Sequence, residues 1–169
     1  MDLATAKQST RAQQDELLSA VPSAAVSTTK QTETSRALFE CETGGYYWPG
    51  TLDIALSEDA DGAALLEQIK ADWSAKSGWT VRDKTSVNGD PELVIVSEEG
   101  YRHAIEFNPE RNALNVLSSS ACFHMEGKPK PGVDYSAPHP RPGNQRGVTS
   151  RPSASFGWAG SDPASFWEG

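Results

Sequence analysis

Hydrophobic and polar residues alternate in several short runs in the middle of this chain, and one longer run has helical spacing. Leu65, Ile69 and Trp73 are successive i,i+4 neighbours, which predicts a helix over Ala63–Lys76 that ends before Gly78. The runs predicted to form strands are Ala37–Cys41, Tyr46–Leu56, Trp79–Val87, Glu92–Ser97, Tyr101–Phe107 and Ala113–Ser118.

Turn-forming residues separate the last four of these strands, beginning with Asn88-Gly89-Asp90. An Asn-Gly pair between two strand-like runs is a strong hairpin signal. The other turns are Glu98-Glu99-Gly100 and Asn108-Pro109-Glu110-Arg111-Asn112. We therefore expect an α+β fold with the order β-β-α-β-β-β-β, in which an antiparallel sheet of about six strands carries a helix on one face.

The two ends of the chain differ from this middle part. Met1–Val21 contains mostly helix-forming residues and is predicted to be a helix that ends before Pro22. Ser23–Arg36 is rich in Ser and Thr without a clear period, which is typical of a linker. Lys128–Gly169 holds 7 of the 11 prolines and 6 of the 14 glycines, which predicts a disordered tail. The expected organisation is a helix and linker over residues 1–36, a domain over 37–127 and a tail over 128–169.

Composition and charge limit the partners of this protein. Hydrophobic residues make up 37% of the 169 residues, and no stretch approaches the ~18 consecutive apolar residues that a membrane span needs. Residues 1–127 carry a net charge of −10 and residues 128–169 carry +2, which together give −8. This charge argues against a general attraction to nucleic acid or anionic lipid. The sequence contains no secretory signal.

The chain has two cysteines, Cys41 and Cys122, at the ends of the first and last predicted strands. If those strands are neighbours, the cysteines could reach the ~4.4–6.8 Å Cα separation that a disulfide requires, and a disulfide would imply an oxidising compartment. Two unrelated buried thiols are the alternative. Metal or redox chemistry is weakly supported, because Cys122 and His124 have no second pair at zinc spacing. The sequence predicts no metal site and no cofactor.

Five short segments carry a resemblance to a known group of proteins. They are the Cys41 segment, the helix ending in Trp73, the Ser77–Val81 junction, the Ser97–Tyr101 turn and the Ser118–Cys122 exit. In these segments the chain resembles small actinobacterial cell-envelope lipoproteins of unassigned function, over about residues 1–125. The resemblance implies an exported, often lipid-anchored α+β domain with one disulfide.

Lipid anchoring does not map onto this chain directly. The signal peptide and lipobox of that group have no counterpart in the sequence, and Phe39-Glu40 precedes Cys41 where small residues are needed. We therefore expect any lipid anchor to lie outside this chain.

Candidate catalytic residues are few. A Ser–His–acid set could be drawn from Ser118–Ser120, His124 and Glu126, but no Gly-x-Ser-x-Gly elbow accompanies it. His103 is interpreted as a solvated or hydrogen-bonded strand histidine. The paired carboxylates fall in turns and at a helix entry, where solvation is the ordinary explanation.

Aromatic residues offer two candidate contact sites. Tyr46, Tyr47 and Trp48 stand between glycines, either as an exposed platform for a glycan or peptide or as a strand end that packs on the helix aromatics. In the tail, Ala154–Trp158 recurs in part as Ala164–Trp167, which suits a docking motif that orders on binding, unless the recurrence is chance. The docking residues would be Phe156, Trp158, Phe166 and Trp167.

No coherent catalytic set emerges from these residues. The sequence thus favours a non-enzymatic binding or structural module of the bacterial cell envelope, whose partner is an unknown protein or cell-wall component. One alternative is a secreted hydrolase that uses His124 with nearby Ser or Glu residues. Another is an adaptor that docks a partner through the Phe/Trp tail.

Overall fold

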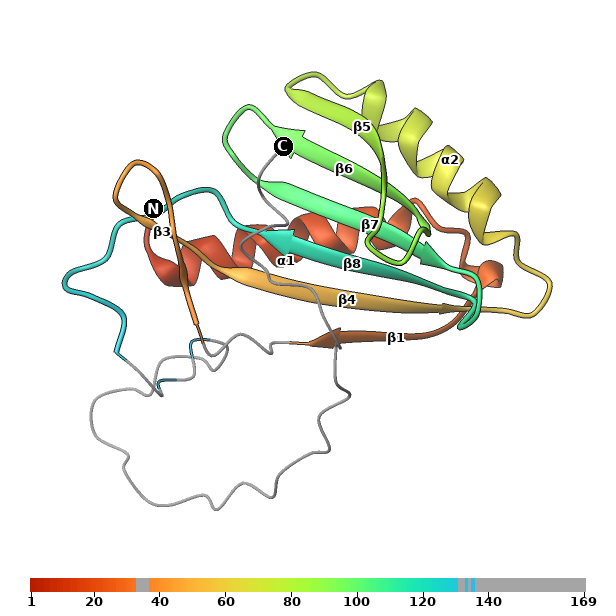
Figure 1. Cartoon of the computed structure of the whole chain (residues 1–169), viewed down its shortest axis with the longest axis horizontal. Helices are drawn as coiled ribbons and strands as arrows, with labels where there is room; N and C mark the ends of the chain where they lie inside the picture. The colour runs from red at the N-terminus through yellow and green to blue at the C-terminus, as the bar shows by residue number, and fades with distance from the viewer. Residues whose placement is uncertain (33–36, 131–132, 134, 136–169) are drawn as a thin grey trace, which may run out of the picture. The chain divides into compact units, whose positions relative to one another are not determined.

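The computed structural model contains a six-stranded antiparallel sheet in the order β1-β4-β8-β7-β6-β5 (Figure 1). It describes residues 1–32, 37–130, 133 and 135. The helices and strands are α1 (Leu3–Ser19), a 3-10 turn (Ser23–Ala25), β1 (Val26–Thr32), β2 (Phe39–Glu40), β3 (Tyr46–Tyr47), β4 (Pro49–Leu56), α2 (Gly62–Ser74), β5 (Trp79–Thr85), β6 (Pro91–Ser97), β7 (Arg102–Asn108) and β8 (Ala113–Ser119). The predicted α+β class, with an N-terminal helix and a sheet of about six strands, is confirmed.

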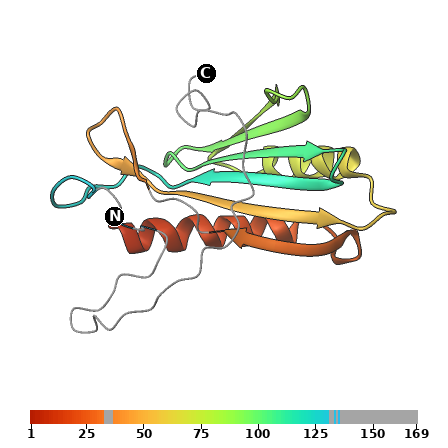
Figure 2. The same cartoon turned by 60° about the horizontal axis from the view of Figure 1, so that its bottom comes forward.

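Both helices pack on the same face of the sheet. Helix α1 contacts β4 and β8, and helix α2 contacts β5, β6 and β7 (Figure 2). Leu17 of α1 and Trp73 of α2 belong to one buried cluster with Ile54, Ile105 and other inward-facing strand residues. Alternate strand residues share a face, so this cluster defines the helix-covered face of the sheet. We call the other face, which carries no helix of the described residues, the open face.

Side-chain caps begin the two helices. The Asp2 carboxylate accepts the Thr5 N–H at 2.8 Å, and the Asp61 carboxylate accepts the Ala64 N–H at 3.0 Å. Each satisfies one of the N–H groups that the first helical turn leaves without a partner. Gly78, at φ +79°, follows α2 in the left-handed region that glycine adopts readily.

The expected linker over Ser23–Arg36 is wrong over half of its length. Residues Val26–Thr32 form β1, which pairs antiparallel with β4. This strand lies at the edge of the sheet and its described side chains are mostly exposed, so it lacks the apolar alternation that identifies an internal strand. Threonine favours strands intrinsically, and that signal was hidden by the polar composition.

The first two predicted strands also need correction. Within Ala37–Cys41 only Phe39–Glu40 is a strand, and it pairs with Tyr46–Tyr47 in a separate two-stranded sheet. The predicted strand Tyr46–Leu56 is divided at Trp48 into β3 and β4. At this position the Trp48 N–H donates to the Ser120 hydroxyl at 2.9 Å and not to a backbone carbonyl of the neighbouring strand.

The predicted meander is confirmed as β5–β8, with its helix on one face. The packed region extends past the predicted boundary at Lys128, because Tyr135 is only 5% exposed and belongs to a second buried cluster with Trp48. The Trp48 indole N–H donates to the Tyr135 carbonyl at 3.3 Å. Apart from residues 128–130, 133 and 135, the tail lies outside the described residues.

Candidate functional site

Cys41 and Cys122 form a disulfide, with their Cα atoms 6.2 Å apart and 81 positions apart in the chain. The bond joins the β2–β3 hairpin to the segment that follows β8. Backbone hydrogen bonds reinforce this junction, because Tyr46 and Phe123 exchange N–H···O bonds of 2.8 and 2.9 Å. The disulfide predicted from the sequence is therefore confirmed, although Cys41 directly follows β2 of the small sheet and does not end a strand of the main one.

The aromatic residues beside this junction were given two alternatives, an exposed platform or a packed strand end. Trp48 is 1% exposed and lies in the second buried cluster with Leu3 of α1, Phe123 and Tyr135. Its ring also has Lys7 and Arg11 at 5.9 Å from its centroid. Of the two alternatives, the exposed platform therefore does not hold for Trp48, because the N-terminal half of α1 and the segment after β8 cover its ring. Tyr46 and Tyr47 are half-buried.

Gly45 shows how closely the hairpin approaches the disulfide. A Cβ atom on this residue would lie 2.6 Å from the Phe123 carbonyl oxygen and 2.7 Å from Cys122 Sγ. Neither neighbour can move freely, since one is backbone and the other is covalently held. Only glycine fits at this position without displacing the junction.

Replacing Gly45 by alanine should therefore destabilise the protein. We expect Gly45→Ala to lower the free energy of unfolding by about 2 kcal/mol, which is typical of overpacking at a rigid contact. The measurement is urea unfolding at neutral pH. Glu42→Ala, an exposed change in the same hairpin, is the control and should stay within about 0.5 kcal/mol of the wild type. Equal stability of both variants would contradict the close contact.

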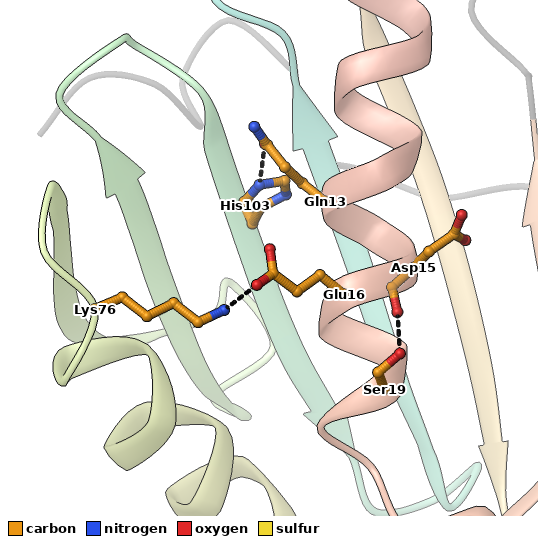
Figure 3. Close-up of polar contacts among 6 residues, drawn as sticks. All are labelled: Gln13, Asp15, Glu16, Ser19, Lys76 and His103. Atoms are coloured by element: carbon orange, nitrogen blue, oxygen red, sulfur yellow. Dashed lines mark hydrogen bonds and ion pairs between the residues drawn. The ribbon is translucent and has the colours of Figure 1, made fainter.

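A buried polar network links α1 to the sheet. His103 of β7 is completely buried, and its Nδ1 lies 2.9 Å from the Ser118 hydroxyl of β8. Its Nε2 lies 2.9 Å from Oε1 of Gln13 on α1, as Figure 3 shows. The next residue on the helix, Gln14, donates to the Ser118 hydroxyl at 3.0 Å and accepts from Gln31 of β1 at 2.8 Å.

The hydrogen bonds in this network fit a neutral imidazole that carries its proton on Nε2. Because an amide oxygen only accepts, His103 Nε2 donates to Gln13, and Nδ1 is left to accept from Ser118. The Ser118 hydroxyl can donate to Nδ1 while it accepts from Gln14. Burial lowers the pKa of His103 to about 3, which agrees with this arrangement. The interpretation of His103 as a hydrogen-bonded strand residue thus describes its environment correctly.

Residues of both helices close over this network. Lys76, just beyond α2, pairs with Glu16 of α1 at 2.7 Å (Figure 3) and lies 3.6 Å from the ring centroid of Trp73. The Trp73 ring meets Trp79 edge-on at 4.6 Å, and both lie about 6 Å from the His103 ring. The imidazole is therefore enclosed by aromatic rings, and this enclosure explains its loss of charge.

The structure does not bring the predicted hydrolase set together. Ser118 bonds to His103, and the Ser120 hydroxyl donates to the Ala121 carbonyl at 2.8 Å. Both serines are fully buried, whereas His124 is exposed. A serine–histidine pair does exist in the described part of the chain, but it involves His103 and is closed to solvent.

A row of polar residues on the open face was not anticipated. It crosses the sheet through directly paired positions, because Asp53 is opposite Asn115, Asn115 is opposite Glu106, and Glu106 is opposite Glu92. We call these four residues, three carboxylates with Asn115 between them, the carboxylate row. The signal was hidden in the sequence, since each acidic residue stands alone on its own strand and only the register aligns them.

The remaining site predictions can be compared with the structure only at the residues that it describes. Phe156, Trp158, Phe166 and Trp167, the predicted docking residues, lie outside the described residues. In the described ranges, no group of three His, Cys, Asp or Glu residues is placed to hold a metal ion. Neither α1 nor α2 has the length and apolar character that a bilayer-crossing helix requires, and they are the α-helices of the described part.

Comparison with known proteins yields one structural likeness. No family model matches the chain, and no curated protein sequence matches it. The chain is similar to the crystal structure of a DUF4853 family protein from Actinomyces odontolyticus, with 18% sequence identity and a TM-score of 0.43. The alignment covers 71% of this chain and 70% of that chain. At this level the likeness carries no statement about function.

Proposed function

We propose that this protein is a non-enzymatic binding or structural module of the bacterial cell envelope. The observation that carries the proposal is the disulfide between Cys41 and Cys122. Protein disulfides persist in oxidising compartments and are rare where thiol reductants are maintained. A structural disulfide is therefore consistent with an extracellular location, and the sequence resemblance to envelope lipoproteins points the same way.

The polar groups of the interior support a structural use more than a catalytic one. Ser118 and His103 are hydrogen-bonded to each other and are of the residue types that serve as nucleophile and general base. Each also makes a hydrogen bond to α1. A catalytic pair must reach its substrate, and both residues are buried completely. Their network instead fixes the helix on the sheet, as expected for a module that presents a rigid surface.

The proposal is tested by the redox state and location of the protein in its own cells. Rapid alkylation with a thiol-reactive polyethylene glycol should leave both cysteines unmodified unless a reductant is added first. Fractionation should place the protein outside the cytosol, with or without an attached lipid. Reduced cysteines in a cytosolic fraction would refute the location, and labelling by a serine-hydrolase probe would refute the non-enzymatic assignment.

A further inference from the structure

Two glutamates of the carboxylate row, on the open face of the sheet, are buried without full hydrogen bonding. Glu92 and Glu106 face each other directly on β6 and β7, yet they are only 6% and 7% exposed. Among the described residues, neither Glu92 Oε1 nor Glu106 Oε1 has a hydrogen-bond partner. A buried carboxylate oxygen without a donor is costly, and like charges directly opposite in a sheet add to that cost.

The placement of this pair follows from the strand register. Leu93 and Ile105 belong to the helix-side cluster, so their neighbours Glu92 and Glu106 point to the other face. In the described part, α1 and α2 both pack on the helix side. The two glutamates therefore lie on a face that carries no helix of that part, and each is more than nine-tenths buried there.

The facing glutamates favour a cationic ligand at the centre of a row that has Lys84 opposite Glu92 at one end and Lys30 opposite Asp53 at the other. Burial raises the pKa of Glu92, the charge of Lys84 on β5 opposes that rise, and the charge of Glu106 adds to it. Burial also raises the pKa of Asp53, although Lys30 and Arg111 oppose the rise. A group that donates several N–H bonds and brings positive charge would satisfy the orphaned oxygens and relieve the repulsion between the two glutamates.

We propose that the open face binds an arginine-bearing extended segment of a partner polypeptide, whose guanidinium groups lie over the carboxylate row. This inference rests on the proposed function as a binding module and names its partner class. A planar guanidinium can donate to two carboxylate oxygens at once, which an ammonium cannot match. Because the carboxylates are already dehydrated, binding does not have to remove their water.

The dimensions of the row fit an extended ligand. Neighbouring strands are about 4.8 Å apart, so the row from Asp53 on β4 to Glu92 on β6 is about 14 Å long across the sheet. Alternate side chains of an extended peptide are about 7 Å apart, so two or three arginines span the row. Val94, Val96 and Leu117 are half-buried on the same face and would receive the apolar side chains of such a segment.

The test uses the full chain and a capped peptide, Arg-Val-Arg-Thr-Arg-Val-Arg, in isothermal titration calorimetry. We expect Glu92→Gln combined with Glu106→Gln to weaken binding at least tenfold. Glu98→Gln combined with Glu99→Gln is the matched control, because it removes the same charge from an exposed turn, and binding should stay within twofold. An equal loss in both double variants would overturn a specific site.

Changes in the peptide and a second measurement complete the test. Replacing arginine by citrulline should abolish binding, and replacing it by lysine should weaken binding severalfold; equal affinity of the lysine peptide would overturn guanidinium recognition. In the wild-type protein, the peptide should shift the side-chain carboxyl NMR signals of Glu92 and Glu106, and unshifted signals would overturn the site without any variant.

Two further outcomes separate this inference from competing explanations. Tighter peptide binding to Arg141→Gln, Arg146→Gln, Arg151→Gln would show that the chain's own arginines compete, which would overturn a partner as the occupant. Reduced cysteines in cells would refute the proposed function and leave peptide binding unaffected. Absence of peptide binding by an oxidised, exported protein would refute this inference alone.

Discussion

Replacing Cys41 and Cys122 together by alanine should lower the free energy of unfolding by about 4.5 kcal/mol, because the cross-link closes a loop of roughly 80 residues and restricts the unfolded chain. Guanidinium unfolding followed by tryptophan fluorescence measures this loss. The fluorescence reports on both buried clusters, since Trp48 lies in the cluster beside the disulfide and Trp73 lies in the other.

Reduction of the wild-type protein provides the control for this prediction. The reduced wild type and the double alanine variant lack the same cross-link, so their stabilities should agree within about 1 kcal/mol, the usual effect of removing two small side chains from partly buried sites. Single alanine variants should resemble the double variant. A loss below about 1 kcal/mol in every case would show that the hairpin junction is held mainly by its packing and hydrogen bonds.

The disulfide matters because the junction has few other connections. The β2–β3 sheet consists of two residue pairs, and the Tyr46–Phe123 bridge joins it to the segment after β8. So small a sheet is marginal in water. The cross-link holds it against the aromatic cluster, and we therefore expect the disulfide to protect Trp48 and Phe123 from solvent as well as to stabilise the whole chain.

Helix α2 and the meander β5–β8 could be predicted from the sequence because their signals are local. Leu65, Ile69 and Trp73 alternate with solvated residues at helical spacing and are buried as that spacing requires. Asn88-Gly89 predicted its hairpin because the turn needs a positive φ, and Gly89 has φ +88°. In these elements local preference and tertiary packing agree.

The elements that were missed depend on partners distant in the chain. Strand β1 is polar because it lies at the edge, and only its pairing with β4 makes it a strand. Trp48 is buried because α1 and Tyr135 cover it, although its neighbours in sequence are glycines and tyrosines typical of a surface loop. A local pattern cannot report contacts made by segments about twenty or more residues away.

The polar network illustrates the same limit in a helix. Thr10 and Gln14 occupy the buried stripe of α1 between Ala6 and Leu17, where a periodicity analysis expects apolar residues. Thr10 satisfies its hydroxyl on the Ala6 carbonyl at 2.8 Å, and Gln14 satisfies its amide on the sheet. Polar residues within an otherwise buried stripe are the signal that identifies such a network.

Acidification should destabilise this protein through His103. Its pKa is about 3 in the folded state because of burial, whereas an unfolded chain has a value near 6.5. Below about pH 6.5 the unfolded state therefore binds a proton at His103 that the folded state does not bind. The free energy of unfolding consequently falls as the pH is lowered to about 3. Between pH 7 and pH 4 this single group should cost about 3 kcal/mol, which urea unfolding at the two pH values measures.

Comparison with His103→Gln isolates this contribution from that of the carboxylates. The variant loses stability at neutral pH because it disturbs the network, but the loss from pH 7 to pH 4 should be smaller than in the wild type by about 3 kcal/mol. His124→Gln, an exposed change, should keep the wild-type difference. Identical pH dependence in the wild type and His103→Gln would mean that the folded protein accepts a charged imidazole. The Ser118 hydroxyl would then accept from Nδ1–H and turn its own proton elsewhere, whereas Nε2 would still donate to Gln13.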